Sequence, residues 1–238
     1  MDAMMLVAPL ILAVGCLVRG IFGFGDALVA VPILALFFPM DQIVVIMGLI
    51  GLVQGGLMIR KGWGDVDWRQ VKTLALSAAV GVPAGLLLVG YVSERVVKVA
   101  LGVLIIAYAL RSLLRIPLPT LRDTRLGAVA GAVSGMCGAA YTLPGPPVIL
   151  YGSASGWSAS DFRATLTAYF LILSVMLNIG FVSAGYWTRD ALVLSAVAAP
   201  GMFLGNMVAD WLGPRIDGEA FGRLLDVVLV VLGVMLLV

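Results

Sequence analysis

The same arrangement of glycines and proline occurs twice in this sequence, each time inside a long hydrophobic segment. Residues 20–32 hold a Gly-x-x-Gly pattern followed by a proline, and residues 135–147 hold the same pattern 115 residues later. Glycine and proline are the residues that most readily interrupt a helix. A helix break duplicated at membrane depth is the best sequence indication of a transporter's binding site. The duplication therefore predicts a small secondary transporter.

The composition places nearly the whole chain in a membrane. Hydrophobic residues make up 62% of the sequence, charged residues only 12%, and the mean hydropathy is +1.11, whereas soluble domains are about 25% charged. We therefore expect an all-α, polytopic membrane protein whose partner is the lipid bilayer. The net charge is +2 and the basic residues are scattered among loops, which argues against nucleic-acid binding. Cys16 and Cys137 lie in apolar segments, where packing is their expected role.

Eight apolar segments divide into two similar sets. The first and fifth segments carry the breaks, and a helical crossing needs about 20 residues. Further glycines recur at an offset of 120 residues, which predicts tandem repeats over residues 1–118 and 119–238, although small residues four apart also suit close helix packing. The matching glycines are Gly81 with Gly201, Gly85 with Gly205, and Gly102 with Gly222. The segments cover approximately residues 4–38, 43–59, 73–92, 96–110, 126–151, 164–186, 191–209 and 220–238.

The relative orientation of the two repeats depends on the broken segments. If each broken segment crosses once, the repeats are parallel; if each turns back as a re-entrant hairpin, the repeats are inverted. Lys and Arg concentrate on the cytoplasmic side. Leaving Arg19 aside, the inverted arrangement puts eleven of them inside and three outside, against nine and five for the parallel one, so inverted repeats are favoured. The eleven are Arg60, Lys61, Arg69, Lys72, Arg111, Arg115, Arg122, Arg125, Arg163, Arg215 and Arg223, and the three are Arg95, Lys98 and Arg189.

Two charged residues flank the glycines of the first break. Arg19 and Asp26 lie in an otherwise apolar segment, and an intramembrane charge is a functional-site hypothesis by default. Three roles stay open and do not exclude one another. The two residues pair across a hairpin tip, Arg19 is the counter-charge for an anionic substrate, or Asp26 carries the coupling proton, because burial disfavours the charged form of a carboxyl.

The second break is neutral and rich in proline. At the 115-residue offset, Ser134 takes the position of Arg19 and Tyr141 that of Asp26. Prolines follow at three of the next six positions; a proline cannot continue a helix but can begin one. Half-helix N-termini present free N–H groups and partial positive charge. Two such ends facing one cavity would favour a small anion.

Polar residues on the segments after the breaks are weaker candidates. Asn178 is the strongest of them, because an amide needs hydrogen-bond partners in lipid. The hydroxyl residues more often bond to their own backbone. The other residues of this group are Gln54, Thr165, Thr167 and Ser174.

Catalytic and metal-binding patterns are missing from the sequence. There is no histidine, which removes imidazole ligands and any Ser-His-Asp triad, and there is no Walker-type phosphate-binding loop. We therefore expect a protein that is not an enzyme and has no cofactor or metal. Energy would come from an ion gradient or from the gradient of the substrate.

The chain resembles the TauE/SafE family of sulfite exporters and sulfonate permease-like proteins over essentially its whole length. The run RGIFGFGDALVAVPIL, its weaker echo SGMCGAAYTLPGPPVIL, the length and the eight apolar segments carry the resemblance. It implies an ion-coupled carrier of sulfur oxyanions or organosulfonates in a bacterial inner membrane. Many members have consecutive glycines at the first break; here Phe24 and Asp26 interrupt that run, and Ala139 and Ala140 do so at the second break.

These observations together predict a proton-coupled, alternating-access transporter of a small anion such as sulfite or a sulfonate, with a homodimer possible for so small a carrier. The alternatives are a carrier of another solute, such as a carboxylate, or a membrane assembly subunit without cargo. Asp26 is the predicted proton carrier. The predicted substrate-binding residues are Arg19, Gly20, Gly23, Gly25, Ser134, Gly135, Gly138, Tyr141, Thr142 and Asn178.

Overall fold

The first hydrophobic segment forms a helical hairpin. The computed structural model describes residues 6–88, 94–114, 116, 124–215 and 218–237. Helix α1 (Val7–Phe22) ends just before Gly23, and helix α2 (Asp26–Leu34) begins just after Gly25. Gly23 and Gly25 have φ angles of 86° and 103°, which glycine adopts at little cost because it has no Cβ. Helix α2 then runs back along α1, since a Cβ added at Gly15 would lie 3.0 Å from the carbonyl oxygen of Asp26.

The fifth segment forms a second hairpin with different turn chemistry. Helix α6 (Thr124–Tyr141) is followed by helix α7 (Gly145–Ala154). Among the described residues, Thr142 is the one non-glycine with a positive φ, 58°, a strained conformation for a β-branched residue. Pro146 and Pro147 fall in the first turn of α7, where a missing N–H removes no helical hydrogen bond. Both predicted breaks are confirmed.

The helix boundaries of the two halves recur at an offset that the glycine pattern did not give. Asp26 and Gly145 begin the returning helices 119 residues apart, and Phe22 and Tyr141 end the entering helices at the same separation. The helix boundaries at the two breaks are thus four residues further apart than the 115-residue spacing of the glycine pattern. At the 119-residue spacing, Gly138 and not Ser134 falls at the position of Arg19.

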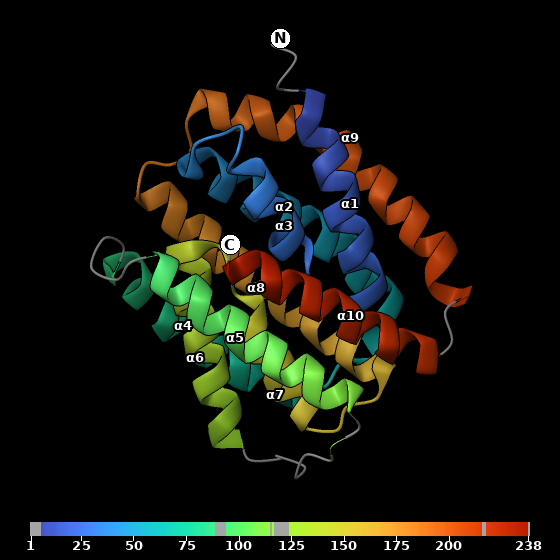
Figure 1. Ribbon diagram of the computed structural model, residues 1–238. Helices are drawn as coiled ribbons and strands as arrows, with labels where there is room; N and C mark the ends of the chain where they lie inside the picture. Colours follow the sequence, from blue (N-terminus) through green and yellow to red (C-terminus); the bar gives the residue numbers. More distant parts are fainter. Residues whose placement is uncertain (1–5, 89–93, 115, 117–123, 216–217, 238) are drawn as a thin grey trace.

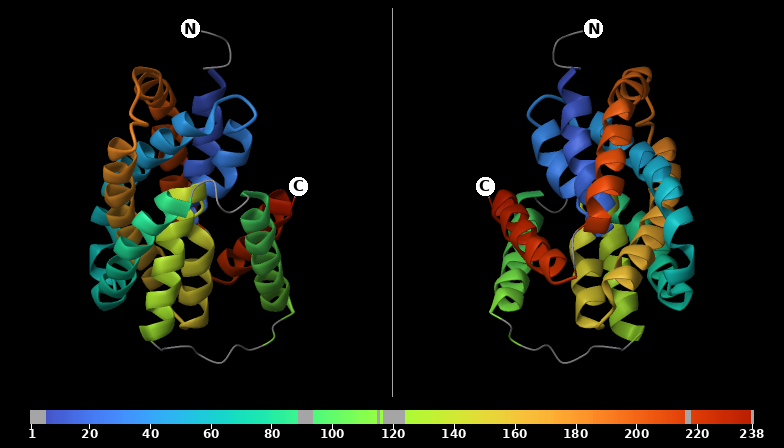
Figure 2. Two further views of the ribbon diagram at one scale, coloured as in Figure 1. Left: turned by 90° about the vertical axis from the view of Figure 1, so that its left-hand side faces the viewer. Right: turned by 90° about the vertical axis from the view of Figure 1, so that its right-hand side faces the viewer.

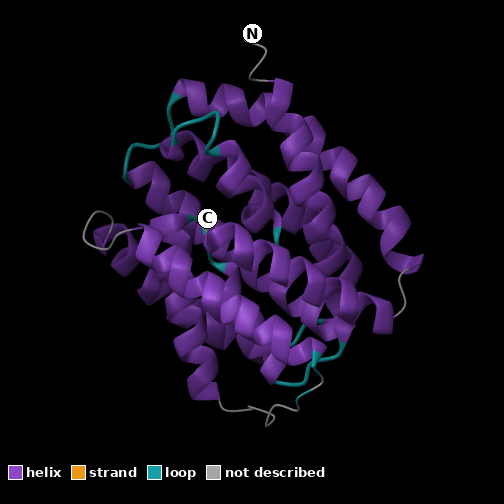
Figure 3. Ribbon diagram, viewed as in Figure 1, coloured by secondary structure: helices purple, strands orange, loops and turns teal. Residues whose placement is uncertain are grey.

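The structure is all-helical over the described residues (Figure 3). Within the described residues, four helical stretches are long and apolar enough to cross a membrane: Met40–Asp65, Trp68–Leu87, Ala159–Ser183 and Arg189–Arg215. The remaining elements are α3 (Met40–Gly62), η2 (Trp63–Asp65), α4 (Trp68–Leu88), α5 (Glu94–Leu113), α8 (Ala159–Ser183), α9 (Arg189–Leu212), η3 (Gly213–Arg215) and α10 (Gly218–Leu237).

Helices from the first half of the chain pack against helices from the second half. The main pairs are α1 with α9, α4 with α6, α3 with α8, and α5 with α10 (Figure 1). The α1–α2 hairpin enters from the end of the molecule where the N-terminus lies, and the α6–α7 hairpin enters from the opposite end (Figure 2). Their turns meet in the interior, so the fold brings two chain reversals together.

Glycines make the closest of these helix contacts. A Cβ at Gly201 of α9 would lie 1.8 Å from the carbonyl oxygen of Pro9 on α1, and one at Gly81 of α4 would lie 2.0 Å from that of Ala132 on α6. Gly85 and Gly205 make equivalent backbone approaches one turn further on. This is the small-residue packing of membrane helices, so the packing interpretation of these four glycines is confirmed.

Candidate functional site

A cavity lies where the two hairpin turns meet; we call it the tip cavity. Its volume is about 50 Å³, enough for water or a small ion. Phe24, Phe170 and Phe181 are among its apolar wall residues, and Arg19 is its one positively charged residue among the described residues. The other wall residues are Gly25, Asp26, Ala27, Leu28, Val44, Met47, Gly48, Thr142, Leu143, Pro144, Gly145, Leu173, Ser174 and Leu177.

Arg19 and Asp26 form an ion pair at the turn of the first hairpin. The Nη1 atom of Arg19 donates to Oδ2 of Asp26 at 2.7 Å, and the two side chains are only 4% and 13% exposed. The guanidinium also lies 5.9 Å from the ring centre of Phe170. Its Nε and Nη2 atoms are buried without a hydrogen-bond partner among the described residues. The predicted pairing is thus confirmed, and it leaves donors available for a ligand.

The two half-helix N-termini differ in what they offer an anion. The first N–H groups of a helix have no intrahelical partner, and in α2 these belong to Asp26, Ala27 and Leu28. In α7 the equivalent positions are Gly145 followed by Pro146 and Pro147, so that only Gly145 supplies an N–H. The two half-helix ends are therefore unequal as anion-binding groups, and the first hairpin supplies most of the N–H donors.

Thr142 adds an unusual polar group to the tip cavity. Its side chain is 5% exposed and its Oγ1 has no partner among the described residues. The residue combines a strained backbone with an unsatisfied buried hydroxyl. Such strain persists only where the surrounding structure enforces it, and it concentrates at functional sites.

Several of the predicted binding residues brace the hairpins instead of lining the tip cavity. Tyr169 donates to the Ser134 hydroxyl at 2.8 Å, and Ser134 donates to the carbonyl of Pro144 at 2.6 Å. Tyr141 lies outside the cavity wall. The glycines pack against neighbouring segments: Gly20 against Ala209, Gly23 against Arg163, Gly135 against Ala78, and Gly138 against Pro144 and Leu177.

Asn178 lies beside the cavity wall. Its Nδ2 donates to the carbonyl of Ser174 at 2.7 Å, and its Oδ1 is buried without a partner among the described residues. The wall glycine Gly48 faces it, since a Cβ there would be 2.9 Å from that oxygen. The amide is therefore adjacent to the tip cavity and not part of its lining.

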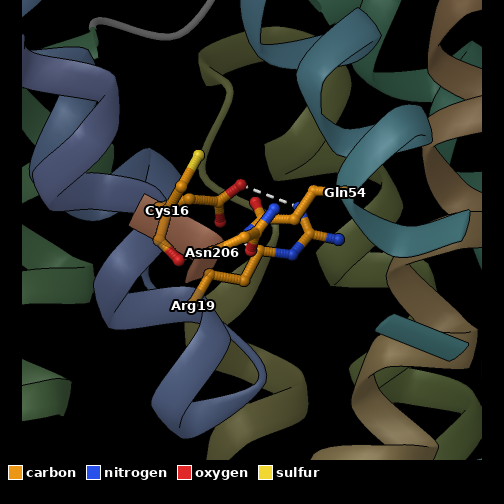
Figure 4. Close-up of polar contacts among 5 residues, drawn as sticks. Cys16, Arg19, Gln54 and Asn206 are labelled. Atoms are coloured by element: carbon orange, nitrogen blue, oxygen red, sulfur yellow. Dashed lines mark hydrogen bonds and ion pairs between the residues drawn. The ribbon is translucent and has the colours of Figure 1, made fainter. Parts of the chain in front are cut away.

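A polar contact between α3 and α9 joins this region; the sequence pattern selected Gln54 as a weaker candidate but not its partner Asn206. Gln54 donates through Nε2 to the carbonyl oxygen of Cys16 at 2.9 Å and to Oδ1 of Asn206 at 2.8 Å. Figure 4 shows these side chains converging with Arg19. The sequence pattern did not select Asn206 as a candidate. An amide side chain in an apolar segment could have identified it, because the same feature selected Asn178.

A second, more open cavity of about 210 Å³ lies on the other side of this contact; we call it the vestibule. Asn206 and Gly20 are among its wall residues, and Lys61 and Asp210 form an exposed ion pair in its wall. The remaining wall residues are Met58, Ile59, Gly62, Asp65, Ser160, Arg163, Ala164 and Thr167.

The fold and the site together define a class of protein. Two opposed helical hairpins that meet at a buried cavity, within a bundle of long apolar helices, are the architecture of a multi-pass membrane transporter, in which irregular backbone at membrane depth is surrounded by protein.

Comparison with known proteins gives the family. Residues 7–236 match the model of the family described as sulfite exporter TauE/SafE, and the chain belongs to that family. Members of this family are transporters and not enzymes. The chain is also 20% identical over 234 residues to a protein of Cupriavidus necator named "Probable sulfite/organosulfonate exporter TauE", covering 95% of this chain and 91% of the relative. No solved structure matches the chain.

Proposed function

We propose that this protein is a secondary active transporter of a small sulfur oxyanion or organosulfonate, coupled to protons and located in a bacterial inner membrane. The observation that carries the proposal is the Arg19 side chain, which is 4% exposed at the tip cavity and has two nitrogens without a hydrogen-bond partner in the described part of the chain. A buried guanidinium that pairs with Asp26 through one nitrogen still offers N–H donors on the other two, which suits an oxyanion because it accepts several hydrogen bonds at once. The function of the family and the name of the Cupriavidus relative agree with this cargo.

Protonation of Asp26 is the proposed coupling step. With Asp26 ionised, its carboxylate neutralises Arg19 at 2.7 Å, and an arriving anion must compete with it. A proton on Asp26 removes that negative charge, so that Arg19 and the first N–H groups of α2 face the anion alone. A proton and a monovalent anion would then bind together, and the loaded site would carry the same net charge as the empty one.

Alternating access would arise from movement of one half of the chain against the other. We propose residues 1–118 and 119–238 as the inverted halves, because the hairpins enter from opposite ends and the helix boundaries at the breaks recur 119 residues apart. The main helix pairs link one half to the other, so a change in their packing could expose the tip cavity to either side. A homodimer remains a prediction.

Flux measurements in proteoliposomes test the proposal. We expect saturable uptake of radiolabelled sulfite and of sulfonates by the wild-type protein, driven by an imposed pH gradient. One pH unit is worth about 1.4 kcal/mol, or about tenfold accumulation for one coupled proton. Asp26→Asn keeps an acceptor for Arg19 but cannot exchange a proton, and should abolish the response to the pH gradient.

Asp41→Asn is the matched control, because Asp41 also lies in the first turn of a helix but is exposed. It should leave the gradient response unchanged. Gradient-driven flux that persists in Asp26→Asn would refute the proton-carrier role. If no sulfur anion is transported but a carboxylate shows saturable flux, the proposed substrate becomes a carboxylate, since Arg also binds carboxylates in a bidentate way. If folded protein transports neither kind of anion, a membrane assembly subunit becomes the better interpretation.

A further inference from the structure

The contact between Gln54 and Asn206 lies next to residues of the tip cavity and of the vestibule. On one side, a Cβ at Gly51, one turn before Gln54, would lie 3.6 Å from Nη1 of Arg19 and 2.6 Å from Oγ of Ser174, and both of these residues line the tip cavity. On the other side, Asn206 lines the vestibule. Gln54 is fully buried between them. We call Gln54 and Asn206 the amide contact.

Hydrogen bonding fixes the direction of both amides. The carbonyl of Cys16 can only accept, so Gln54 must present its amino group to it, and the second hydrogen of that group goes to Oδ1 of Asn206. Asn206 must therefore turn its own amino group away from Gln54. That Nδ2 atom is buried and has no partner among the described residues.

The result is a set of unpaired donors that continues beyond the tip cavity. Arg19 contributes Nε and Nη2, and its neighbour in the chain, Gly20, already lines the vestibule together with Asn206. A Cβ at Gly20 would lie 2.3 Å from Cβ of Ala209 and 3.7 Å from Oδ1 of Asn206, so the backbone at Gly20 lies directly beside α9 and the amide. Buried donors without partners are rare in folded proteins and call for an explanation.

We propose that Asn206, gated by Gln54, is a second oxyanion-binding position through which the substrate passes between Arg19 and the vestibule. This inference rests on the proposed function, because it assigns a path to the same anion. When the Gln54–Asn206 hydrogen bond breaks, the anion can move from Arg19 toward the vestibule. The Nδ2 of Asn206 then donates a hydrogen bond to the anion. The Nδ2 of Asn206 is a donor and suits an oxyanion, whereas an aspartate at the same place would repel it; the Oε1 of Gln54, which is also buried without a partner among the described residues, must turn away when the contact opens.

Binding and flux of radiolabelled sulfite separate this role from a role in the tip cavity. Asn206→Asp keeps an acceptor for Gln54 but removes the donor and adds a negative charge. We expect equilibrium binding to purified full-length protein to stay within about threefold of wild type while proteoliposome flux falls at least tenfold. Gln70→Glu is the matched amide-to-acid control, since Gln70 lies outside both cavities and its Oε1 accepts from Tyr151 at 2.9 Å. It should change neither quantity.

Each other outcome decides the question. Unchanged flux in Asn206→Asp overturns the proposal, and so does loss of binding together with flux, because Asn206 would then act on the tip cavity. If Asn206→Asp does not fold, Asn206→Ser, which keeps a donor, should retain at least five times the flux of Asn206→Ala, and equal fluxes overturn the proposal. Absence of sulfite and sulfonate binding by the wild-type protein instead refutes the proposed function, which distinguishes the two failures.

Discussion

The buried ion pair between Arg19 and Asp26 makes a quantitative prediction about stability. Asp26→Ala would leave the Arg19 side chain, 4% exposed, without its one hydrogen-bonded partner among the described residues. Breaking one half of a buried pair typically costs about 3–5 kcal/mol, because an uncompensated charge stays behind. Replacing both residues by apolar side chains of similar size, as in Arg19→Met with Asp26→Leu, should cost less than about 1 kcal/mol or stabilise the fold.

The measurement is unfolding by sodium dodecyl sulfate in mixed micelles, followed by the fluorescence of the five tryptophans. The exposed pair of Lys61 and Asp210, with side chains 63% and 56% exposed, is the matched control. Asp210→Ala should change the free energy of unfolding by about 1 kcal/mol or less. If the double variant loses as much stability as Asp26→Ala, the pair itself stabilises the fold and the reasoning from desolvation is refuted.

Three further substitutions test the packing and the turn. Gly201→Ala should lower the free energy of unfolding by about 1–3 kcal/mol, because its Cβ would overlap backbone atoms of Pro9. An unchanged unfolding midpoint would contradict this. Gly56→Ala meets nothing within 4 Å and should stabilise by about 0.4–1 kcal/mol in the same assay, through the unfolded chain. Thr142→Gly should relieve a positive φ and raise stability by about 1 kcal/mol, while weakening sulfite binding because a cavity hydroxyl is lost; tighter binding would refute a ligand role for Thr142.

The broken helices could be predicted from sequence because their cause is local. Glycines at residues 23 and 25 adopt positive φ angles that other residues avoid. The prolines after residue 143 can begin a helix but cannot continue one. The charge of Arg19 in an apolar segment was likewise visible, and its pairing with Asp26 follows from their positions on the two sides of one short turn.

The register between the two halves could not be predicted in the same way. Glycines are common in this chain, so a pattern of glycines alone aligned Ser134 with Arg19. The structure instead makes Ser134 a hydrogen-bonded brace between α6 and α7. Hairpin turns set the correspondence, and a positive φ at a threonine has no signal in the sequence.

The membrane class, the two helix breaks and the presence of two charges at the first break could be read from the sequence, because hydropathy, backbone freedom and charge act over a few residues; that the two charges pair is seen in the fold. Which residues share a cavity depends on the packing of the helices. Arg19 and Thr142 are 123 positions apart in the chain, and Gln54 and Asn206 are 152 apart. Such neighbours meet only when helices from the two halves pack, and that packing depends on close backbone approaches that no single segment encodes.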